Sequence, residues 1–348
     1  MIDKNTYSLL NLERLVKKYK RDKEIIARSI FALGLVEALS RSGANFIFKG
    51  GSALMLMFER IKRLSTDVDI LVEPGYDIDL YLNKASQIFP FTGFKEEIRT
   101  TNKTITKRHF RLTYPSLSSG NVYTVLLDVL FAPNSYSKII QTPVKNDLLI
   151  CKGKDIFVNI PSPECLLGDK LTAFAPHTIG KPFYDGSHQR DGRLEVLKQF
   201  YDLSCLFDIC TNFKDVRDTY KKLAIEEIDY RNLSISPDEC LKDTFDSALC
   251  ILSRGHYGNE EYPYYVSGFE KISHHIIDGR VNGDNSMMSA SKVMLLSSCL
   301  LKGVDPFNLL IEEQELITDR NFNKINSVRK TNKKAFDLAV KAISIFCS

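Results

Sequence analysis

Hydrophobic and polar positions divide the chain into a front part that mixes strand and helix patterns and a back part with helix patterns alone. In the front part, short apolar runs typical of buried strands alternate with longer segments in which apolar residues recur at helical spacing. We expect strands at residues 45–48, 67–72, 94–101, 107–114, 122–130 and 156–159, and helices at residues 22–40, 77–89, 163–174 and 194–210.

After residue 211, each periodic segment has the spacing of an α-helix, and polar joints separate the segments. These predicted helices cover residues 214–227, 237–252, 262–277, 286–301 and 328–346. Strands with helices followed by helices alone are typical of an α+β fold with a helical C-terminal domain. The pattern therefore predicts two domains, residues 1–210 and residues 211–348, with the boundary near 210.

One stretch joins a glycine turn, a short helix and a strand with two acidic residues. Gly50 and Gly51 let the backbone approach a phosphate closely, and Ser52 opens a helix whose amides face an anion. Asp67 and Asp69 are expected on the same face of their strand, where two carboxylates repel each other unless a cation lies between them. This predicts a divalent metal beside a triphosphate, as in nucleotidyl transfer. A helix cap at Ser52 with a solvated acidic edge is the structural alternative.

Several segments resemble the motifs of one known family. Residues 49–54 (KGGSAL) and 63–69 (RLSTDVD) are similar to the first motif of the AbiEii/AbiGii abortive-infection nucleotidyltransferase toxins. That family lies in the DNA polymerase β-like nucleotidyltransferase superfamily and includes the MenT toxins. Residues 162–173, with a central lysine, and residues 200–203, with an aspartate, resemble two later motifs, so the resemblance covers about residues 25–210.

The resemblance implies a polymerase β-like mixed sheet flanked by helices, in an enzyme that depends on Mg²⁺ or Mn²⁺. It implies transfer of a nucleoside monophosphate from a nucleoside triphosphate to RNA, with the tRNA 3′ end as acceptor, so that translation and growth stop. It also implies a cognate antitoxin protein as partner. Two alternatives stay open: a nucleotidyltransferase that modifies a small molecule or a protein, and a non-catalytic nucleotide-binding protein of the same fold.

A lysine and an aspartate on two later helices complete the site that the resemblance implies. Lys170 lies on an apolar helix, where a lysine usually extends its ammonium group to solvent. The resemblance makes Lys170 a ligand of the triphosphate instead. Asp202, on the next helix, has alternative roles: it holds Lys170 in place, binds metal through water, or activates the acceptor hydroxyl.

Two further residues each have a functional and a structural interpretation. Asp128 stands near the end of an apolar strand, where a carboxylate needs a partner. The superfamily supplies a third metal-site acid from a neighbouring strand, and the alternative for Asp128 is a bond to a turn amide. Ser65 precedes Asp67 by two residues, so its hydroxyl is expected on the metal side, near the nucleotide phosphates. Some family members are controlled by serine phosphorylation at this motif; the alternative is a bond to a loop amide.

Two basic segments are candidates for RNA contact. Residues 177–193 form a loop with histidine, lysine and arginine between glycines and prolines, which suits a lid over RNA or nucleotide. Lys103, Lys107, Arg108 and Arg111 lie on a predicted hairpin, where they can touch a phosphate backbone. A surface loop and a solvated strand edge would have the same sequences.

Composition limits the class of protein without identifying its substrate. The chain has 348 residues, 44% of them apolar, which is enough for one large or two smaller cores. Its net charge of +4 permits RNA binding without arguing for it. The eight cysteines form no CxxC pair, the N-terminus lacks the apolar core of a signal peptide, and no apolar run has the length of a membrane span. We therefore expect a cytoplasmic protein with reduced thiols and no membrane contact.

Overall fold

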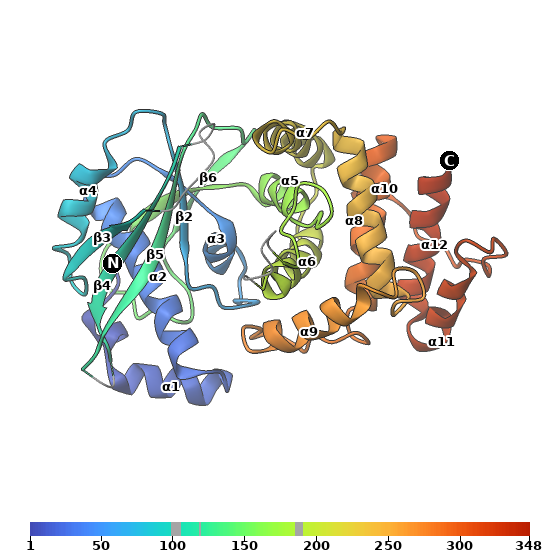
Figure 1. The fold of residues 1–348 in the computed structure, drawn as a ribbon. Helices are drawn as coiled ribbons and strands as arrows, with labels where there is room; N and C mark the ends of the chain where they lie inside the picture. Colours follow the sequence, from blue (N-terminus) through green and yellow to red (C-terminus); the bar gives the residue numbers. More distant parts are fainter. Residues whose placement is uncertain (99–105, 118–119, 185–190) are drawn as a thin grey trace. The chain divides into compact units, whose positions relative to one another are not determined.

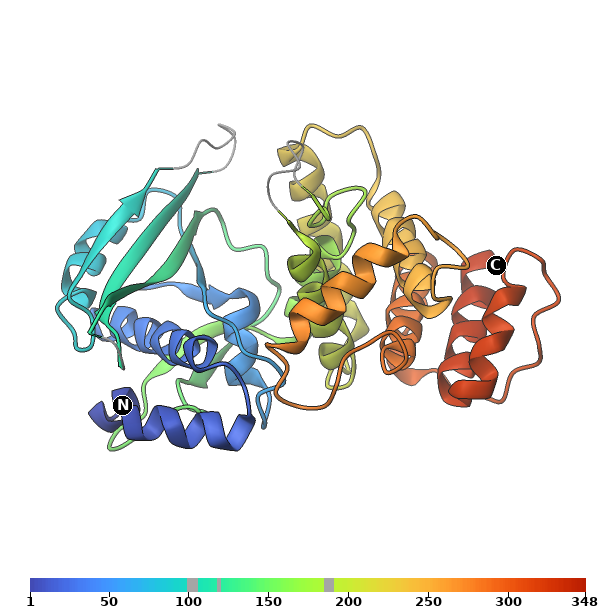
Figure 2. The ribbon, with the colours of Figure 1, turned by 60° about the horizontal axis from the view of Figure 1, so that its bottom comes forward.

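The computed structural model describes residues 1–98, 106–117, 120–184 and 191–348. In these ranges the chain forms two compact units (Figures 1 and 2). The first unit contains Met1–Ser162 and a later segment, His274–Gly279. The second unit contains Pro163–Ser273 and Arg280–Ser348. The chain thus returns to the first unit for a few residues before it completes the second.

A mixed sheet forms the centre of the first unit. In the described residues its strands are β1 (Ile47–Lys49), β2 (Val68–Val72), β3 (Gly93–Glu97), β4 (Thr106–Pro115), β5 (Val122–Phe131), β6 (Ile139–Pro143) and β7 (Phe157–Pro161). They lie in the order β3-β4-β5-β2-β1-β7-β6. β2 runs parallel to β5 and β1 runs parallel to β7, whereas the other neighbouring strands are antiparallel.

Helices of the first unit share one hydrophobic core with the sheet. After the short 3₁₀ helix η1 (Lys4–Tyr7), the helices are α1 (Leu9–Tyr19), α2 (Lys23–Arg41), α3 (Gly50–Met57) and α4 (Ile78–Ala85). α2 begins after Asp22, whose side chain accepts hydrogen bonds from two amides of the first turn. All four α-helices supply buried residues to this core, and α1 also packs on α2 (Figure 2, in blue).

Alternation along the strands gives the sheet an apolar face and a more polar face. On β2, Ile70 is buried in the core, and on β5 Leu127 is buried there too. Successive residues of a strand point to opposite sides. Asp69 and Asp128 therefore point to the side away from this core, although both are partly buried. The carboxylates stand on the face that the helices of the core leave open.

The second unit is built from helices. They are α5 (Pro163–Ala173), α6 (Arg193–Phe207), α7 (Phe213–Tyr230), α8 (Pro237–Leu252), α9 (Tyr262–Ser273), α10 (Met287–Lys302), α11 (Val328–Thr331) and α12 (Lys333–Cys347), with short 3₁₀ helices η2 (Pro306–Asn308) and η3 (Asn323–Ser327). α5 packs closely on α7: a Cβ atom at Gly168 would lie 2.8 Å from the carbonyl oxygen of Val216. Within the described ranges, no helix is both long and apolar enough to span a membrane.

The expected α+β class is confirmed, but the units divide elsewhere than expected. The division falls between Ser162 and Pro163, whereas the sequence pattern places a boundary near residue 210. Packing explains the difference, because α5 packs on α7 and α6 packs on α9. Both helices follow the last strand before residue 210, yet their apolar faces are covered by later helices.

The predicted helix 328–346 is divided into α11 and α12, and two further elements differ from the periodic pattern. β6 was not expected, because it is a short edge strand of mixed polarity that pairs only with β7 in the described sheet. The predicted helix 262–277 ends at Ser273. The residues that follow pair instead with the loop before β2: Leu64 N donates to the carbonyl oxygen of His275 at 2.8 Å, and Ile277 N donates to that of Lys62 at 2.9 Å.

Candidate functional site

The turn from β1 into α3 requires glycine at residue 50. Gly50 has a φ angle of +76°, in the left-handed region that side-chain-bearing residues avoid. A Cβ atom at Gly50 would also overlap Oδ2 of Asp69. The glycine turn that was expected to approach a phosphate therefore also makes room for the Asp69 carboxylate.

Asp69 and Asp128 lie side by side on neighbouring strands. β2 and β5 are parallel, and these two residues are partners in the register. Partners in register point to the same face, and neighbouring strands are about 4.8 Å apart, so two carboxylates come close together. Asp128 thus occupies the position that a third acid would need. Its carboxylate is bonded to a side chain of the sheet, His109, and not to a turn amide.

A lysine and a histidine flank this carboxylate pair in the same row of the sheet. Lys49 on β1 is the register partner of Asp69, and His109 on β4 is the register partner of Asp128. His109 is 8% exposed, and its Nδ1 lies 2.7 Å from Oδ1 of Asp128. The row reads Lys49, Asp69, Asp128, His109, so groups that can carry positive charge stand on both sides of two carboxylates.

Asp67 lies one residue before β2, which begins at Val68. Its carboxylate is 3.8 Å from the guanidinium group of Arg28 on α2, and both side chains are about half exposed. Its carbonyl oxygen accepts a hydrogen bond from the hydroxyl of Ser52. Ser52 is fully buried, so its hydroxyl fixes the backbone at Asp67. The expectation that Ser52 opens the helix is corrected: α3 begins at Gly50, and no side chain caps it.

The loop between α3 and β2 places Arg63 and Ser65 next to Gly51. A Cβ atom at Gly51 would lie 2.6 Å from Nη2 of Arg63 and 2.9 Å from Oγ of Ser65. Arg63 is 4% exposed, and its Nη1 donates to the carbonyl oxygen of Leu64 at 3.2 Å. The first amides of a helix lack intrahelical partners and attract anions. A buried guanidinium group beside them increases the positive charge at this turn, which Ser65 faces.

The donor set of the first unit suits a hard divalent cation. Carboxylate oxygens are the ligands that Mg²⁺ and Mn²⁺ prefer. In the part of the chain that the structure describes, no three His, Cys, Asp or Glu side chains are grouped closely enough to hold a metal ion alone. Mg²⁺ in nucleotide-dependent enzymes is usually bound through one or two carboxylates, substrate phosphates and water. The adjacent Asp69 and Asp128 fit that requirement, and the set of Asp67, Asp69 and Asp128 stays a prediction.

Lys170 and Asp202 form a buried ion pair in the second unit. Lys170 on α5 is 6% exposed and Asp202 on α6 is 2% exposed. The Lys170 Nζ lies 3.0 Å from Oδ2 of Asp202 and donates to Oε1 of Gln199 at 2.8 Å. The lysine therefore does not extend to solvent. Asp202 thus contacts Lys170 directly, as the first of its alternative roles requires, and all three roles stay predictions.

The loop after α5 begins with a fixed histidine. His177 Nδ1 lies 2.6 Å from Oδ1 of Asp243, and its Nε2 lies 2.5 Å from Oε1 of Glu261. The hydrogen bond to Asp243 raises the pKa of His177 to about 9. The start of the predicted lid is thus tied to α8. Residues His188 and Arg190 of the same loop lie outside the described residues.

The basic hairpin is divided between the two faces of the sheet. Arg108 pairs with carboxylates on α4 and β3, of which Asp79 is the nearer at 2.6 Å. Lys107 and Arg111 alternate with Arg108 along β4 and are exposed, so they point to the face that carries the carboxylate pair. Lys103 lies outside the described residues. Only part of the predicted basic run can therefore serve one ligand.

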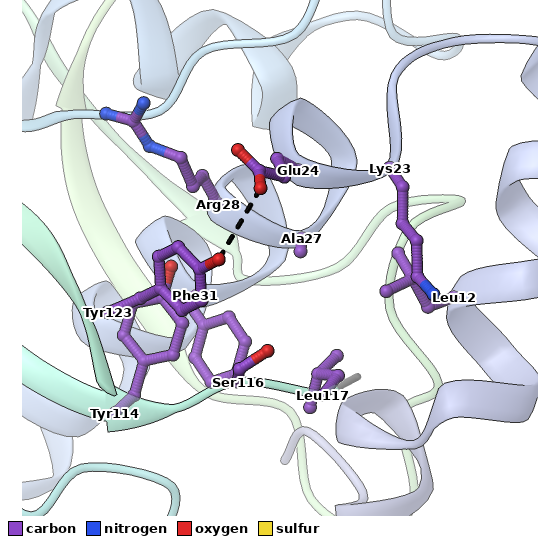
Figure 3. Close-up of a pocket in the computed structure, with 10 residues that line it drawn as sticks. All are labelled: Leu12, Lys23, Glu24, Ala27, Arg28, Phe31, Tyr114, Ser116, Leu117 and Tyr123. Atoms are coloured by element: carbon purple, nitrogen blue, oxygen red, sulfur yellow. Dashed lines mark hydrogen bonds between the residues drawn. The ribbon is translucent and has the colours of Figure 1, made fainter. Parts of the chain in front are cut away.

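A pocket of about 260 Å³ opens on the helix side of the first unit (Figure 3). Tyr114 stacks on Phe31 there with ring centroids 3.6 Å apart, and burial raises the pKa of Tyr114 to about 12. The hydroxyl of Tyr123 points toward Glu24 (Figure 3). Arg28 lines this pocket and also faces Asp67, so the pocket and a predicted metal ligand share one cation.

Sequence reasoning missed three residues, each of which lies next to a predicted site residue of its own unit. Gln199 precedes Asp202 by three positions, and this helical spacing was the available signal. Arg63 is part of the RxSxDxD segment but had no assigned role. His109 gave no signal, because its contact with Asp128 depends on the register of β4 against β5, which the sequence pattern does not determine.

Comparisons with known proteins agree with the motif resemblance. The family model described as nucleotidyl transferase AbiEii toxin, type IV toxin–antitoxin system, matches residues 34–254. Among curated proteins no match was found. MenT4, a nucleotidyltransferase toxin of Mycobacterium tuberculosis, is 12% identical, with 95% of this chain and 98% of that chain covered and a TM-score of 0.50. JHP933 of Helicobacter pylori is 12% identical, with 87% and 95% covered and a TM-score of 0.43.

Proposed function

Because this chain belongs to the AbiEii nucleotidyltransferase toxin family, it is the nucleotidyltransferase toxin of a toxin–antitoxin system, and we propose its substrates and its site. It transfers a nucleoside monophosphate from a nucleoside triphosphate to an RNA acceptor, the 3′ end of tRNA. The observation that carries the proposal is the pair Asp69 and Asp128, in register beside the glycine turn at Gly50. A phosphate-binding turn and two metal-binding carboxylates are what this chemistry requires.

Asp67 and Asp69 bind the divalent metal in this proposal, with Asp128 as the third carboxylate. Bound Mg²⁺ or Mn²⁺ supplies positive charge for the triphosphate and acidity for the acceptor hydroxyl. Asp69 and Asp128 are held on one face by their strands, and the sheet fixes their separation before any ligand binds. Such preorganisation avoids the entropy that would be lost if mobile side chains had to become ordered when the ligand binds.

The N-terminal turn of α3 binds the triphosphate. Gly50 and Gly51 allow close approach of the phosphates to the backbone, and the amide of Ser52 belongs to the same turn. The Ser52 hydroxyl holds Asp67, so its contribution to the metal site is indirect. Ser65 faces the turn from the other side. Lys170, held by Asp202, adds the positive charge that the family motif assigns to phosphate binding.

The reaction is an in-line displacement at the α-phosphorus. The acceptor hydroxyl loses its proton to solvent, and its oxygen forms a bond to the α-phosphorus. The bond from that phosphorus to the oxygen bridging to the β-phosphate breaks, and pyrophosphate leaves with the electron pair. The RNA thereby gains one nucleotide, and a tRNA extended at its 3′ end cannot be charged, which stops translation.

The antitoxin and the cell compartment follow from this activity. A toxin of this family requires a cognate antitoxin protein to protect the cell that makes it. Nucleoside triphosphates and tRNA are cytoplasmic, so we place the protein in the cytoplasm. The absence of disulfides among the eight cysteines, which are all free, is consistent with a reducing compartment.

Transfer of labelled nucleotide tests the proposal. Each of the four α-labelled triphosphates is incubated with purified tRNA, Mg²⁺ and the wild-type chain, with Asp69→Asn as the matched inactive variant. We expect label on the tRNA 3′ end from wild type and a loss of more than about a hundredfold in the variant, because loss of a group that only supports a metal ligand already costs about 10–100-fold. Label on a protein or small molecule, with none on RNA, would overturn the assigned acceptor.

A further inference from the structure

A buried histidine contacts the carboxylate pair. His109 is 8% exposed, and its Nδ1 lies 2.7 Å from Oδ1 of Asp128. Asp69, the register partner of Asp128 on the other side, stands in the same row. None of the motifs on which the family resemblance rests includes residue 109. The histidine therefore needs an explanation of its own.

The contact fixes which atom donates. An ionised carboxylate accepts hydrogen bonds and donates none. The proton of this hydrogen bond must therefore be on Nδ1 of His109. Within the described residues, Oδ1 of Asp128 accepts this hydrogen bond from His109. Oδ2 of Asp128 is then the oxygen that stays available to a ligand. The hydrogen bond thus selects both the rotation of the carboxylate and the oxygen that it presents.

We propose that His109 is a positioning residue of the nucleotidyltransferase site, which holds Asp128 so that its second oxygen faces the ligand position beside Asp69. This inference rests on the proposed function, in which Asp69 and Asp128 belong to the metal-binding site. His109 does not touch the substrate in this proposal. Its role resembles that of groups behind metal ligands generally, which orient the ligand and strengthen its binding.

The surroundings favour positioning over simple packing. Apolar residues fill the core side of β4, where Phe110 and Leu112 are fully buried. His109 is on the other face of the strand, where the residues two positions before and after it, Lys107 and Arg111, are exposed. A buried imidazole there costs free energy unless it is hydrogen-bonded. The hydrogen bond to Asp128 offsets this free-energy cost, and it also holds a carboxylate of the proposed metal site in one orientation.

Side-chain replacements that keep or remove the donor test the proposal. His109→Asn places an amide N–H near the position of Nδ1, whereas His109→Leu removes the donor and His109→Gln moves it outward to the position of Nε2. Thr113→Val is the matched control, because Thr113 lies four positions after His109 on β4 and its hydroxyl donates to the carbonyl oxygen of Gly93 on β3. Melting curves confirm that each variant is folded.

Two quantities are measured for each variant. The first is Mn²⁺ binding to the protein without nucleotide, followed by electron paramagnetic resonance, and the second is kcat and KM for the triphosphate. We expect His109→Leu to lower Mn²⁺ affinity and kcat by about 10–100-fold, with a smaller change in KM. His109→Asn should recover most of both losses, His109→Gln should not, and Thr113→Val should leave both unchanged.

Several results would overturn the inference. One is a folded His109→Leu protein with wild-type Mn²⁺ affinity and kcat; another is a folded His109→Asn protein that is no better than His109→Gln. If His109→Leu does not fold, the comparison of Asn with Gln decides. Absence of transfer by the wild type would refute the proposed function instead, and the Mn²⁺ measurement would still decide whether His109 positions Asp128.

Discussion

Gly50 shows at the scale of one residue how backbone and side chain share the site. Its φ angle of +76° and the Asp69 oxygen beside it each exclude a larger residue. Gly75 has a similar φ angle, +81°, but no atom lies within 4 Å of a Cβ atom built there. Substitution of both glycines would cause backbone strain, but only substitution of Gly50 would also crowd the Asp69 carboxylate.

Gly50→Ala should lose both stability and activity, whereas Gly75→Ala should lose only stability. A side chain in the left-handed region costs about 1–2 kcal/mol, which both variants share. Only Gly50→Ala displaces Asp69 from its place beside Asp128. Chemical denaturation and nucleotidyl transfer, measured on both variants, separate the two effects. Equal transfer by both variants would show that Asp69 does not depend on the shape of this turn.

Some residues of the site could be predicted from the sequence, and others could not. Asp69 and Gly50 could be predicted, because a period of two and a glycine turn are local patterns. Ser52 could be located but not interpreted, since its hydroxyl contacts the backbone of Asp67 across the loop. His109 could not be found, because strand register joins residues far apart in the chain.

At the scale of elements, α5 and α6 are joined by one buried charge pair. Lys170 and Asp202 lie 3.0 Å apart with almost no exposure. Two buried charges cost free energy to desolvate, and their attraction offsets that cost only while both are present. In the proposed function, Lys170 of this pair binds the triphosphate. Stability and activity should therefore respond differently to removal of one or both charges.

Lys170→Met and Asp202→Asn should each lower the free energy of unfolding by about 3–5 kcal/mol, because each leaves one buried charge without its partner. The double variant should recover most of this loss, except for the lost bond to Gln199, and should still bind triphosphate about ten- to a hundredfold less tightly. Urea denaturation and nucleotide titration are the measurements. A double variant less stable than both single variants would contradict the ion-pair explanation.

His177 ties the start of a loop to α8, and its titration gives a pH prediction. Its pKa is raised to about 9, chiefly by the hydrogen bond to Asp243, from about 6.5 in an unfolded chain. The folded state therefore binds the proton more tightly, and the stabilisation is complete below about pH 6.5 and lost as the pH rises through about 9. Unfolding midpoints between about pH 6 and 10 should fall more steeply for wild type than for His177→Gln. Parallel curves would refute this role.

Element boundaries followed the sequence where a local signal existed. α8 begins at a capping box of Ser236 and Glu239, with proline at its first position. α9 ends at Ser273 although the apolar pattern continues, because residues 274–279 belong to the first unit. β6 carries too little periodicity to predict. In both cases, contacts with a distant segment of the chain determine the element: the first unit for residues 274–279 and β7 for β6.

At the scale of the whole molecule, the boundary between the units follows packing rather than composition. The sequence changes from mixed to helical near residue 210, but the first unit ends at Ser162 and regains His274–Gly279. Ile276 in that segment is 1% exposed, and its carbonyl oxygen accepts a hydrogen bond from Nε of Arg21 at 2.5 Å. Ile277 of the same segment packs against the core of the first unit, although the earlier part of that unit ends more than a hundred positions before it.

This division predicts how fragments of the chain behave. A fragment of residues 1–162 joined by a flexible linker to residues 274–279 should fold, because it contains all of the first unit. A fragment of residues 1–210 should aggregate, because α5 and α6 keep apolar faces that α7 and α9 cover in the whole chain. With Ile277→Asp, the linked fragment should lose up to about 3 kcal/mol of stability, the free energy of burying an isoleucine side chain, because Ile277 packs against the core of the first unit. Size-exclusion chromatography and urea denaturation compare the three proteins. A monomeric, cooperatively unfolding 1–210 fragment would place the boundary at residue 210 after all, since α5 and α6 would then need no later helix to cover them.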